Sequence, residues 1–141
     1  MAADAFEIEI ATPDRLLVRE KAVRSQIPCK NGYIGVLPGH AALLSELGIG
    51  ALTYVTPQDH RFSIAIKHGF LEILDDHVRI LADDADKGDE IDTTEAEKQL
   101  RHAQHEMLNP AVGIDIAAAL IAYKHAQAKI DAARKQLNKE E

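Results

Sequence analysis

The residues best placed to do chemistry begin with an acidic run over residues 83–92. Asp84, Asp86 and Glu95 stand at the first, third and twelfth positions of a calcium-binding loop, where side-chain oxygens ligate the ion. The sixth position of such a loop requires glycine, and Asp89 stands there. We therefore interpret the run as a solvated linker that caps the following helix, and we predict no calcium site.

The remaining reactive side chains form no catalytic pattern. His102 and His105 lie three residues apart beside Glu106, a spacing that suits a metal but is more typical of polar helix surface, so we predict no metal. The single cysteine, Cys29, has no neighbouring histidine to activate it as a nucleophile. No glycine pattern that cradles phosphate is present. We predict no catalytic residue and no cofactor, so the chain is not itself an enzyme.

The N-terminal part of the chain, which comes before most of these residues, has the pattern of β-strands. Phe6, Ile8 and Ile10 alternate with polar residues, which is typical of a half-buried strand. Glycine and proline then separate short runs rich in strand-forming residues, the rhythm of an antiparallel sandwich or barrel. The nine expected strands are 6–12, 16–18, 23–27, 33–36, 41–47, 49–55, 62–66, 70–74 and 78–82.

After Asp83 the apolar period changes to that of a helix. We predict one helix from Thr93 to Leu108 and a second from about Asp115 to about Leu137, joined by a turn. The stripe expected on the first helix is Ala96, Leu100, Ala103 and Met107, and that on the second is Ile116, Leu120, Tyr123, Ile130 and Leu137. A seam this thin is marginally stable alone, so the hairpin should dock on another surface and be able to leave it.

The predicted fold class is therefore α+β, with strands before helices. Residues 1–88 form an N-terminal antiparallel β-sandwich, and residues 89–141 form a C-terminal antiparallel two-helix hairpin. The net charge of −7 argues against a nucleic-acid partner. With one cysteine, no apolar run long enough for a bilayer and no targeting peptide, we expect the protein to stay in a reducing compartment where it is made.

One segment is more specific than any of these patterns. Residues 31–44 read Asn-Gly-Tyr-Ile-Gly-Val-Leu-Pro-Gly-His-Ala-Ala-Leu-Leu. They resemble the signature of the epsilon subunit of the F-type rotary ATP synthase, which forms two strands and the turn between them. The opening strand ending at residues 12–14, the pair of strands after Gly69, and Ile91-Asp92 follow in the same order. The resemblance covers essentially the whole chain.

The resemblance implies a non-catalytic central-stalk subunit that couples proton flow to ATP synthesis. Such a subunit binds the gamma subunit and the c-ring of the membrane sector, and it meets the membrane only through the complex. The expected location is the cytoplasmic face of the bacterial inner membrane. The residues expected in the loop facing the c-ring are Lys30, Asn31, Gly32 and Tyr33, with His40 nearby.

In the same family the terminal helices can leave the sandwich, reach the alpha/beta catalytic head and block ATP hydrolysis. The basic side chains expected to act there are Lys124, Lys129, Arg134 and Lys135. Some bacterial members bind ATP through a motif whose arginine is replaced here by Glu95, so we expect weak or absent ATP binding. The alternative interpretation is a small-ligand-binding β-sandwich whose helical lid covers an anion site.

Overall fold

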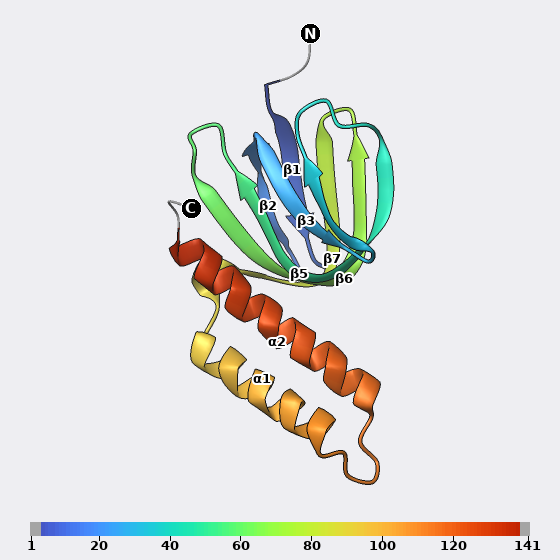
Figure 1. Cartoon of the computed structure of the whole chain (residues 1–141). Coiled ribbons are helices and arrows are strands. Elements are labelled where there is room, and N and C mark those ends of the chain that lie inside the picture. Colours follow the sequence, from blue (N-terminus) through green and yellow to red (C-terminus); the bar gives the residue numbers. More distant parts are fainter. Residues whose placement is uncertain (1–3, 139–141) are drawn as a thin grey trace.

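The computed structural model describes residues 4–138 as a sandwich followed by two helices (Figure 1). Residues 1–3 and 139–141, at the outer ends of the two predicted domains, lie outside the described residues. The strands are β1 (Phe6–Ala11), β2 (Leu16–Ala22), β3 (Arg24–Cys29), β4 (Gly32–Val36), β5 (Leu43–Val55), β6 (Arg61–Leu74) and β7 (His77–Lys87). A short 3-10 turn, η1 (Gly88–Glu90), leads to α1 (Thr93–Leu108) and α2 (Ile116–Leu137).

The seven strands are hydrogen-bonded in the order β2-β1-β7-β6-β5-β3-β4. Neighbouring strands are antiparallel except β1 and β7, which run parallel. The sheet curls so that its two halves face each other around one core (Figure 1). Phe6, Ile8 and Ile10 are all buried there, as their alternation predicts. The predicted fold class is confirmed.

The prediction of nine strands is wrong, because two pairs of expected strands are continuous. Residues 43–55 form β5 and residues 61–74 form β6, although glycines interrupt both. Pairing is missing along one row, at Gly48, His68 and Asp83 of β5, β6 and β7. On each strand the buried side chains occupy alternate positions, and at this row they shift from odd to even residue numbers or the reverse, which is called the change of parity below. The glycines therefore bend the strands without ending them.

Gly69 shows why that bend needs glycine. Its φ is 122°, a conformation that other residues rarely adopt, and a Cβ there would overlap the carbonyl oxygen of Leu81. His68, just before it, also has a positive φ of 54°. The row that links Gly48, His68 and Asp83 is called the bend row below.

The helix limits agree with the sequence because their capping residues set them. Asp92 caps α1 by accepting a hydrogen bond from the Glu95 amide at 3.2 Å, and Asp115 does the same for Ala118 on α2. The helices lie antiparallel, with α2 against the sheet and α1 on the outer side of α2 (Figure 1). The division at residue 88 stays a prediction; β7 ends at Lys87 and α1 begins at Thr93.

The apolar stripe expected on α2 is wrong. Ile116, Leu120 and Leu137 are exposed, while Tyr123 and Ile130 are half-buried. The residues of α2 that are buried are small ones and one glutamine: Ala119, Ala126, Ala128, Ala132, Ala133 and Gln136. Alanines allow the helix backbone to approach both α1 and the sheet closely, and larger residues would hold it away. On α1 the expected stripe is correct, with Ala96 and Ala103 buried and Leu100 and Met107 half-buried.

Among residues 4–138, neither helix has the combined length and apolar character needed to cross a membrane.

Candidate subunit interface and hairpin contact

Large apolar side chains lie exposed on the outer face of β5, β6 and β7, beyond the bend row from α2. Leu44 is 74% exposed and Phe70 is 56% exposed, and Phe70 lies directly across from Leu81. The members of this apolar patch are Leu44, Phe70, Leu74 and Leu81. Exposed apolar side chains gathered on one face are typical of a surface that binds another protein.

Charged side chains lie between the members of the apolar patch and beside it. Arg79, between Glu9 and Glu72 on adjacent strands, lies 3.9 Å and 3.8 Å from their carboxylates. On the next row the hydrogen bonds from Arg19, at 3.3 Å, and His77 lower the pKa of Glu7. Apolar side chains mixed with charges of both signs are what an interface uses to fix the orientation of its partner.

The residues expected to face the c-ring lie at two different places. Lys30 and Asn31 form the turn between β3 and β4, where Lys30 pairs with Glu46 at 3.2 Å. Gly32 has a φ of 122°, and the hydroxyl of the half-exposed Tyr33 accepts a hydrogen bond from the Ala51 amide at 3.0 Å.

His40 lies in the loop at the other end of β4, so its expected proximity to residues 30–33 is wrong. The reason is that the intervening residues run extended as β4 instead of turning back. The neighbouring Gly39 amide donates to Asp76 Oδ1 at 2.7 Å, which ties this loop to the turn between β6 and β7.

Polar groups hold the C-terminal half of α2 on the sheet. The Ser63 amide donates to Gln136 Oε1 at 2.9 Å, and Gln136 Nε2 donates to the Arg61 carbonyl at 3.3 Å. The Ser63 hydroxyl donates to the carbonyl of Ala132. Ser63 and Gln136 are both buried. These bonds satisfy buried groups that would otherwise destabilise the docked position.

Small residues form the apolar part of the same contact. Ala51 of β5 and Ala65 of β6 pack against Ala128 and Ala132 of α2, and all four are nearly fully buried. Tyr123 of α2 lines an open groove between the helix and the β3–β4 turn. Ile49 and Ile91 pack beside these alanines, and the side chains that α2 itself buries are alanines and Gln136.

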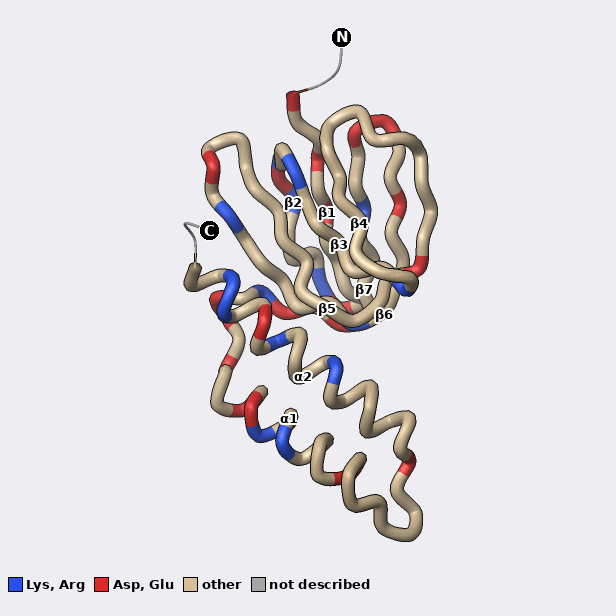
Figure 2. The backbone as a smooth tube through the Cα atoms, in the orientation of Figure 1, with Lys and Arg blue, Asp and Glu red and all other residues tan. Residues whose placement is uncertain are grey.

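The four basic residues of α2 that are expected to contact the catalytic head lie in different surroundings. Lys124 lines the groove beside the β3–β4 turn, and the Lys129 ammonium lies 3.5 Å from Gln99 on α1. Arg134 is exposed, and Lys135 lines a separate hollow with Arg24 and Arg61. Figure 2 shows basic positions spread along α2 and not gathered at one point. The four residues therefore do not converge on one place, although Lys135 shares its hollow with two arginines.

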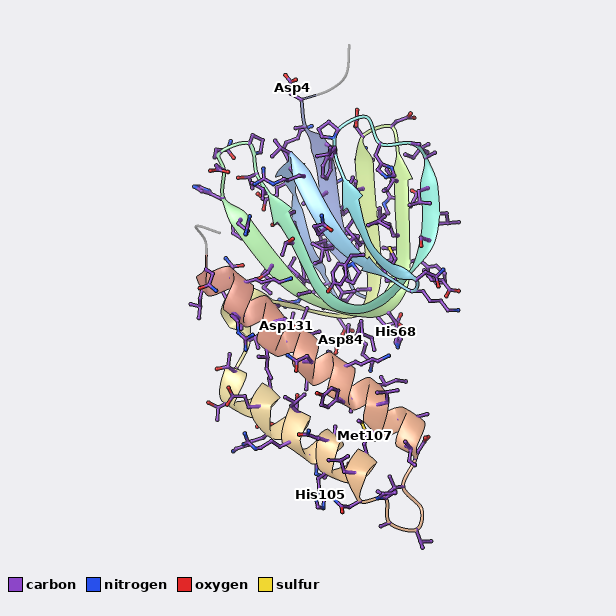
Figure 3. The ribbon with its side chains drawn as sticks, viewed as in Figure 1. Asp4, His68, Asp84, His105, Met107 and Asp131 are labelled. Carbon is purple, nitrogen blue, oxygen red and sulfur yellow. The ribbon has the colours of Figure 1, made fainter. Side chains whose placement is uncertain are left out.

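The histidines considered as metal ligands on α1 also separate. His102 pairs with Glu106 at 2.7 Å, whereas His105 lies near Asn109. Figure 3 shows His105 on the side of α1 away from α2 and Met107 on the side toward it. Burial raises the pKa of Cys29, so this thiol is held in its unreactive protonated form.

Comparison with known proteins decides the family. The family model for the β-sandwich domain of the ATP synthase delta/epsilon chain matches residues 5–88. A curated ATP synthase epsilon chain from Solibacter usitatus is 50% identical over 94% of this chain and 98% of that protein. The chain belongs to the ATP synthase epsilon chain family. Another epsilon chain, from Syntrophomonas wolfei, is 34% identical and covers 97% of this chain and 100% of its own length.

The fold of this epsilon-family chain also agrees with a solved structure. A chain in the Euglena gracilis mitochondrial ATP synthase structure, which comprises OSCP, F1 and the c-ring, aligns with a TM-score of 0.82 and 23% identity. The alignment covers 95% of this chain and 84% of the other. At that identity the match supports the fold alone. The resemblance seen in residues 31–44 is confirmed by the family match.

Proposed function

We propose that this epsilon-family chain is a non-catalytic coupling subunit of the ATP synthase central stalk, and that it binds the gamma subunit through the apolar patch. The exposure of Leu44, Phe70, Leu74 and Leu81 on one outer face is the observation that carries the proposal. The mixture of apolar and charged groups there suits a partner held in one orientation. The subunit would lie at the membrane surface only through the complex, on the cytoplasmic face of a bacterial inner membrane.

The c-ring contact is proposed for the edge strand β4 and the loops at its two ends. β4 is the last strand in the sheet order, so one of its sides has no neighbour in the sheet. The loop residues named in the sequence analysis lie at both ends of this strand: Lys30, Asn31, Gly32 and Tyr33 at one end, and His40 at the other. An exposed edge, with polar side chains in the turn at one end and His40 in the loop at the other, offers backbone and side-chain hydrogen bonds to the polar loops of a ring of small subunits.

The two-helix hairpin is proposed as the regulator of ATP hydrolysis. Alanines form the centre of the apolar contact between α2 and the sheet, with Ile49 and Ile91 packed beside them. A docked position stabilised by only a few kcal/mol can exchange with an extended one that reaches the catalytic head. Lys124, Lys129, Arg134 and Lys135 would then meet acidic surface on the alpha and beta subunits.

Deletion of residues 93–141 tests this proposal. The core of the sandwich involves residues 6–85, so the truncated chain should fold. Loss of the helices uncovers Ala51, Ser63 and Ala65 together with Ile49 and Ile91, which lie outside the core of the sandwich. We expect the truncated chain to co-purify with gamma as the full chain does, and the reconstituted enzyme to hydrolyse ATP without the restraint imposed by the hairpin. Failure of the folded truncated chain to bind gamma would contradict the assignment of that contact to the sandwich.

We also propose that the isolated chain does not bind ATP at millimolar concentration. Glu95 stands where the ATP-binding motif has arginine, and its carboxylate repels polyphosphate. Glu95→Arg should strengthen ATP binding about tenfold or more, measured by calorimetry. Glu97→Arg makes the same change of charge two residues along α1 and should give no such gain. ATP binding by the unmodified chain with a dissociation constant in the millimolar range or below would contradict the proposal.

A further inference from the structure

Three potential metal ligands from distant parts of the chain meet where α2 crosses the sheet. Asp84 and Asp86 lie on β7, and His125 lies on α2. One ligand atom from each residue lies within 4.8 Å of those of the other two. Figure 3 shows Asp84 at the junction between the sheet and α2. Among the described residues, this is the single group of three or more such side chains close enough to share an ion.

The bend row and the small residues of α2 explain why the three side chains converge. After Asp83 the outward positions of β7 become Asp84 and Asp86, which lie across from Lys67 and Ala65 of β6. Ala65 packs directly under Ala128 and Ala132 of α2. His125 is three residues before Ala128, on the same face of the helix, and so it reaches the adjoining strand.

The imidazole of His125 has an unsatisfied polar atom at this place. Its side chain is 15% exposed, and its Nε2 atom is buried with no hydrogen-bond partner among residues 4–138. The nearest carboxylate oxygen, Asp84 Oδ2, is 3.6 Å away, which is too long for a hydrogen bond. The buried Nε2 atom therefore lies close to two carboxylates without a hydrogen bond, and an imidazole nitrogen is a common metal ligand.

Two ammonium groups limit the affinity of such a site. Lys67 is the cross-strand partner of Asp84, and Lys129 follows His125 by one helical turn. The Lys129 ammonium lies 3.5 Å from Gln99 on α1, which draws it toward the other helix. Within the sheet, Lys67 stands directly across from Asp84, one of the two carboxylates. Its charge would repel a cation, so its removal should strengthen binding.

We propose that Asp84, Asp86 and His125 bind one divalent transition-metal ion, with Zn²⁺ the best match, and that the ion fastens the docked α2 to β7. One imidazole and two carboxylates with a water in the fourth position form a ligand set that zinc accepts, whereas calcium and magnesium prefer oxygen ligands alone. Ligand atoms around one zinc ion lie about 3.3 Å apart, so small side-chain rotations would close the site.

A metal held this way binds the docked hairpin and not the extended one, because the extended hairpin separates His125 from the carboxylates. Bound ion therefore stabilises the docked position by mass action. This inference concerns the isolated chain and does not depend on the proposed contacts with gamma or the c-ring. Zinc binding can be absent while the gamma and c-ring contacts are found, and zinc binding can be found while those contacts are absent.

The test uses the full-length, untagged chain after treatment with a chelator. Titration with ZnCl₂ in a calorimeter should show one ion bound, and Co²⁺ as a spectroscopic probe should develop the visible absorption of a cobalt site with nitrogen and oxygen ligands. His125→Gln and Asp86→Asn should each weaken binding about tenfold or more. Zn²⁺ should slow amide exchange in α2 of the parent chain and leave α2 of His125→Gln unchanged.

His102→Gln is the matched control, because His102 also pairs with a carboxylate but lies on α1. It should bind Zn²⁺ as the parent chain does. Lys67→Gln removes no ligand and should bind more tightly, which keeps the test decisive even if a ligand variant folds poorly. The proposal is overturned if no Zn²⁺ binds at millimolar concentration, if His102→Gln loses the site while His125→Gln keeps it, or if Lys67→Gln does not tighten binding.

Discussion

Replacement of Phe70 and Leu81 by glutamate should weaken binding to the gamma subunit at least about 100-fold. The two side chains face each other across β6 and β7, and both are more than half exposed in the free chain. Burying a large apolar side chain in an interface contributes about 1.5–3 kcal/mol, so loss of two corresponds to a factor of about 100 or more. Two new carboxylates buried against an apolar partner weaken binding further.

The measurement is the dissociation constant for gamma, or co-purification where the affinity is too high to titrate. Leu16→Glu is the matched control, since Leu16 is 50% exposed, as Leu81 is at 51%, but lies on β2 outside the apolar patch. Both changes are at exposed positions, so the stability of the sandwich should fall little in either variant. Normal gamma binding by the double variant would show that the partner sits elsewhere on the sandwich.

A single methyl group at Gly88 should release the hairpin from the sheet. The Cβ of Gly88→Ala would lie 2.6 Å from the Ala132 carbonyl oxygen, 2.6 Å from the Ser63 hydroxyl and 2.9 Å from Gln136 Cβ. Helix α2 must move away, which breaks the hydrogen bonds that Ser63 donates to Gln136 and to the Ala132 carbonyl. Overpacking and broken buried hydrogen bonds together cost about 3 kcal/mol, comparable to the whole stabilisation expected for so small a contact.

Hydrogen exchange measures this effect directly. Amides of α1 and α2 in Gly88→Ala should exchange about 100-fold faster than in the parent chain, while those of β1 and β7 stay protected. Gly35→Ala is the control, because its Cβ would meet only the flexible side chain of Gln26 at 3.4 Å. In the assembled enzyme, the released hairpin should inhibit ATP hydrolysis more strongly. Unchanged exchange in Gly88→Ala would mean that the helix tolerates the methyl group where it lies.

Local chemistry explains which parts of the fold could be predicted from the sequence. The helix ends were predicted because Asp92 and Asp115 are capping residues and the apolar period changes there. The number of strands was not predicted, because a glycine such as Gly48 or Gly69 looks the same in the sequence whether it ends a strand or bends one. Only the pairing partners across β5, β6 and β7 distinguish the two cases.

The contact surfaces were harder to predict for a related reason. Sequence patterns give weight to large apolar residues, so Ile116 and Leu120 were expected in the seam, whereas close approach of backbones selected Ala128 and Ala132. Phe70 is in phase with the buried Ile64 and Ile66 of its strand, and only the change of parity at the bend row turns it outward. Leu81 is out of phase with the buried Val78 and Ile80, so alternation alone places it on the outer face. The meeting of Asp84 with His125 depends on a helix that returns to the sheet forty-one positions later, which no local pattern records.

The bend row also determines how force would travel through the molecule. Strands β5, β6 and β7 run without a break from the apolar patch, through the bend, to the surface under α2. Hydrogen-bonded strands resist stretching and shear far better than a loop does, so a load applied at one surface reaches the other with little lost to deformation. If the apolar patch holds gamma as proposed, the continuous strands join that contact directly to the surface on which α2 rests.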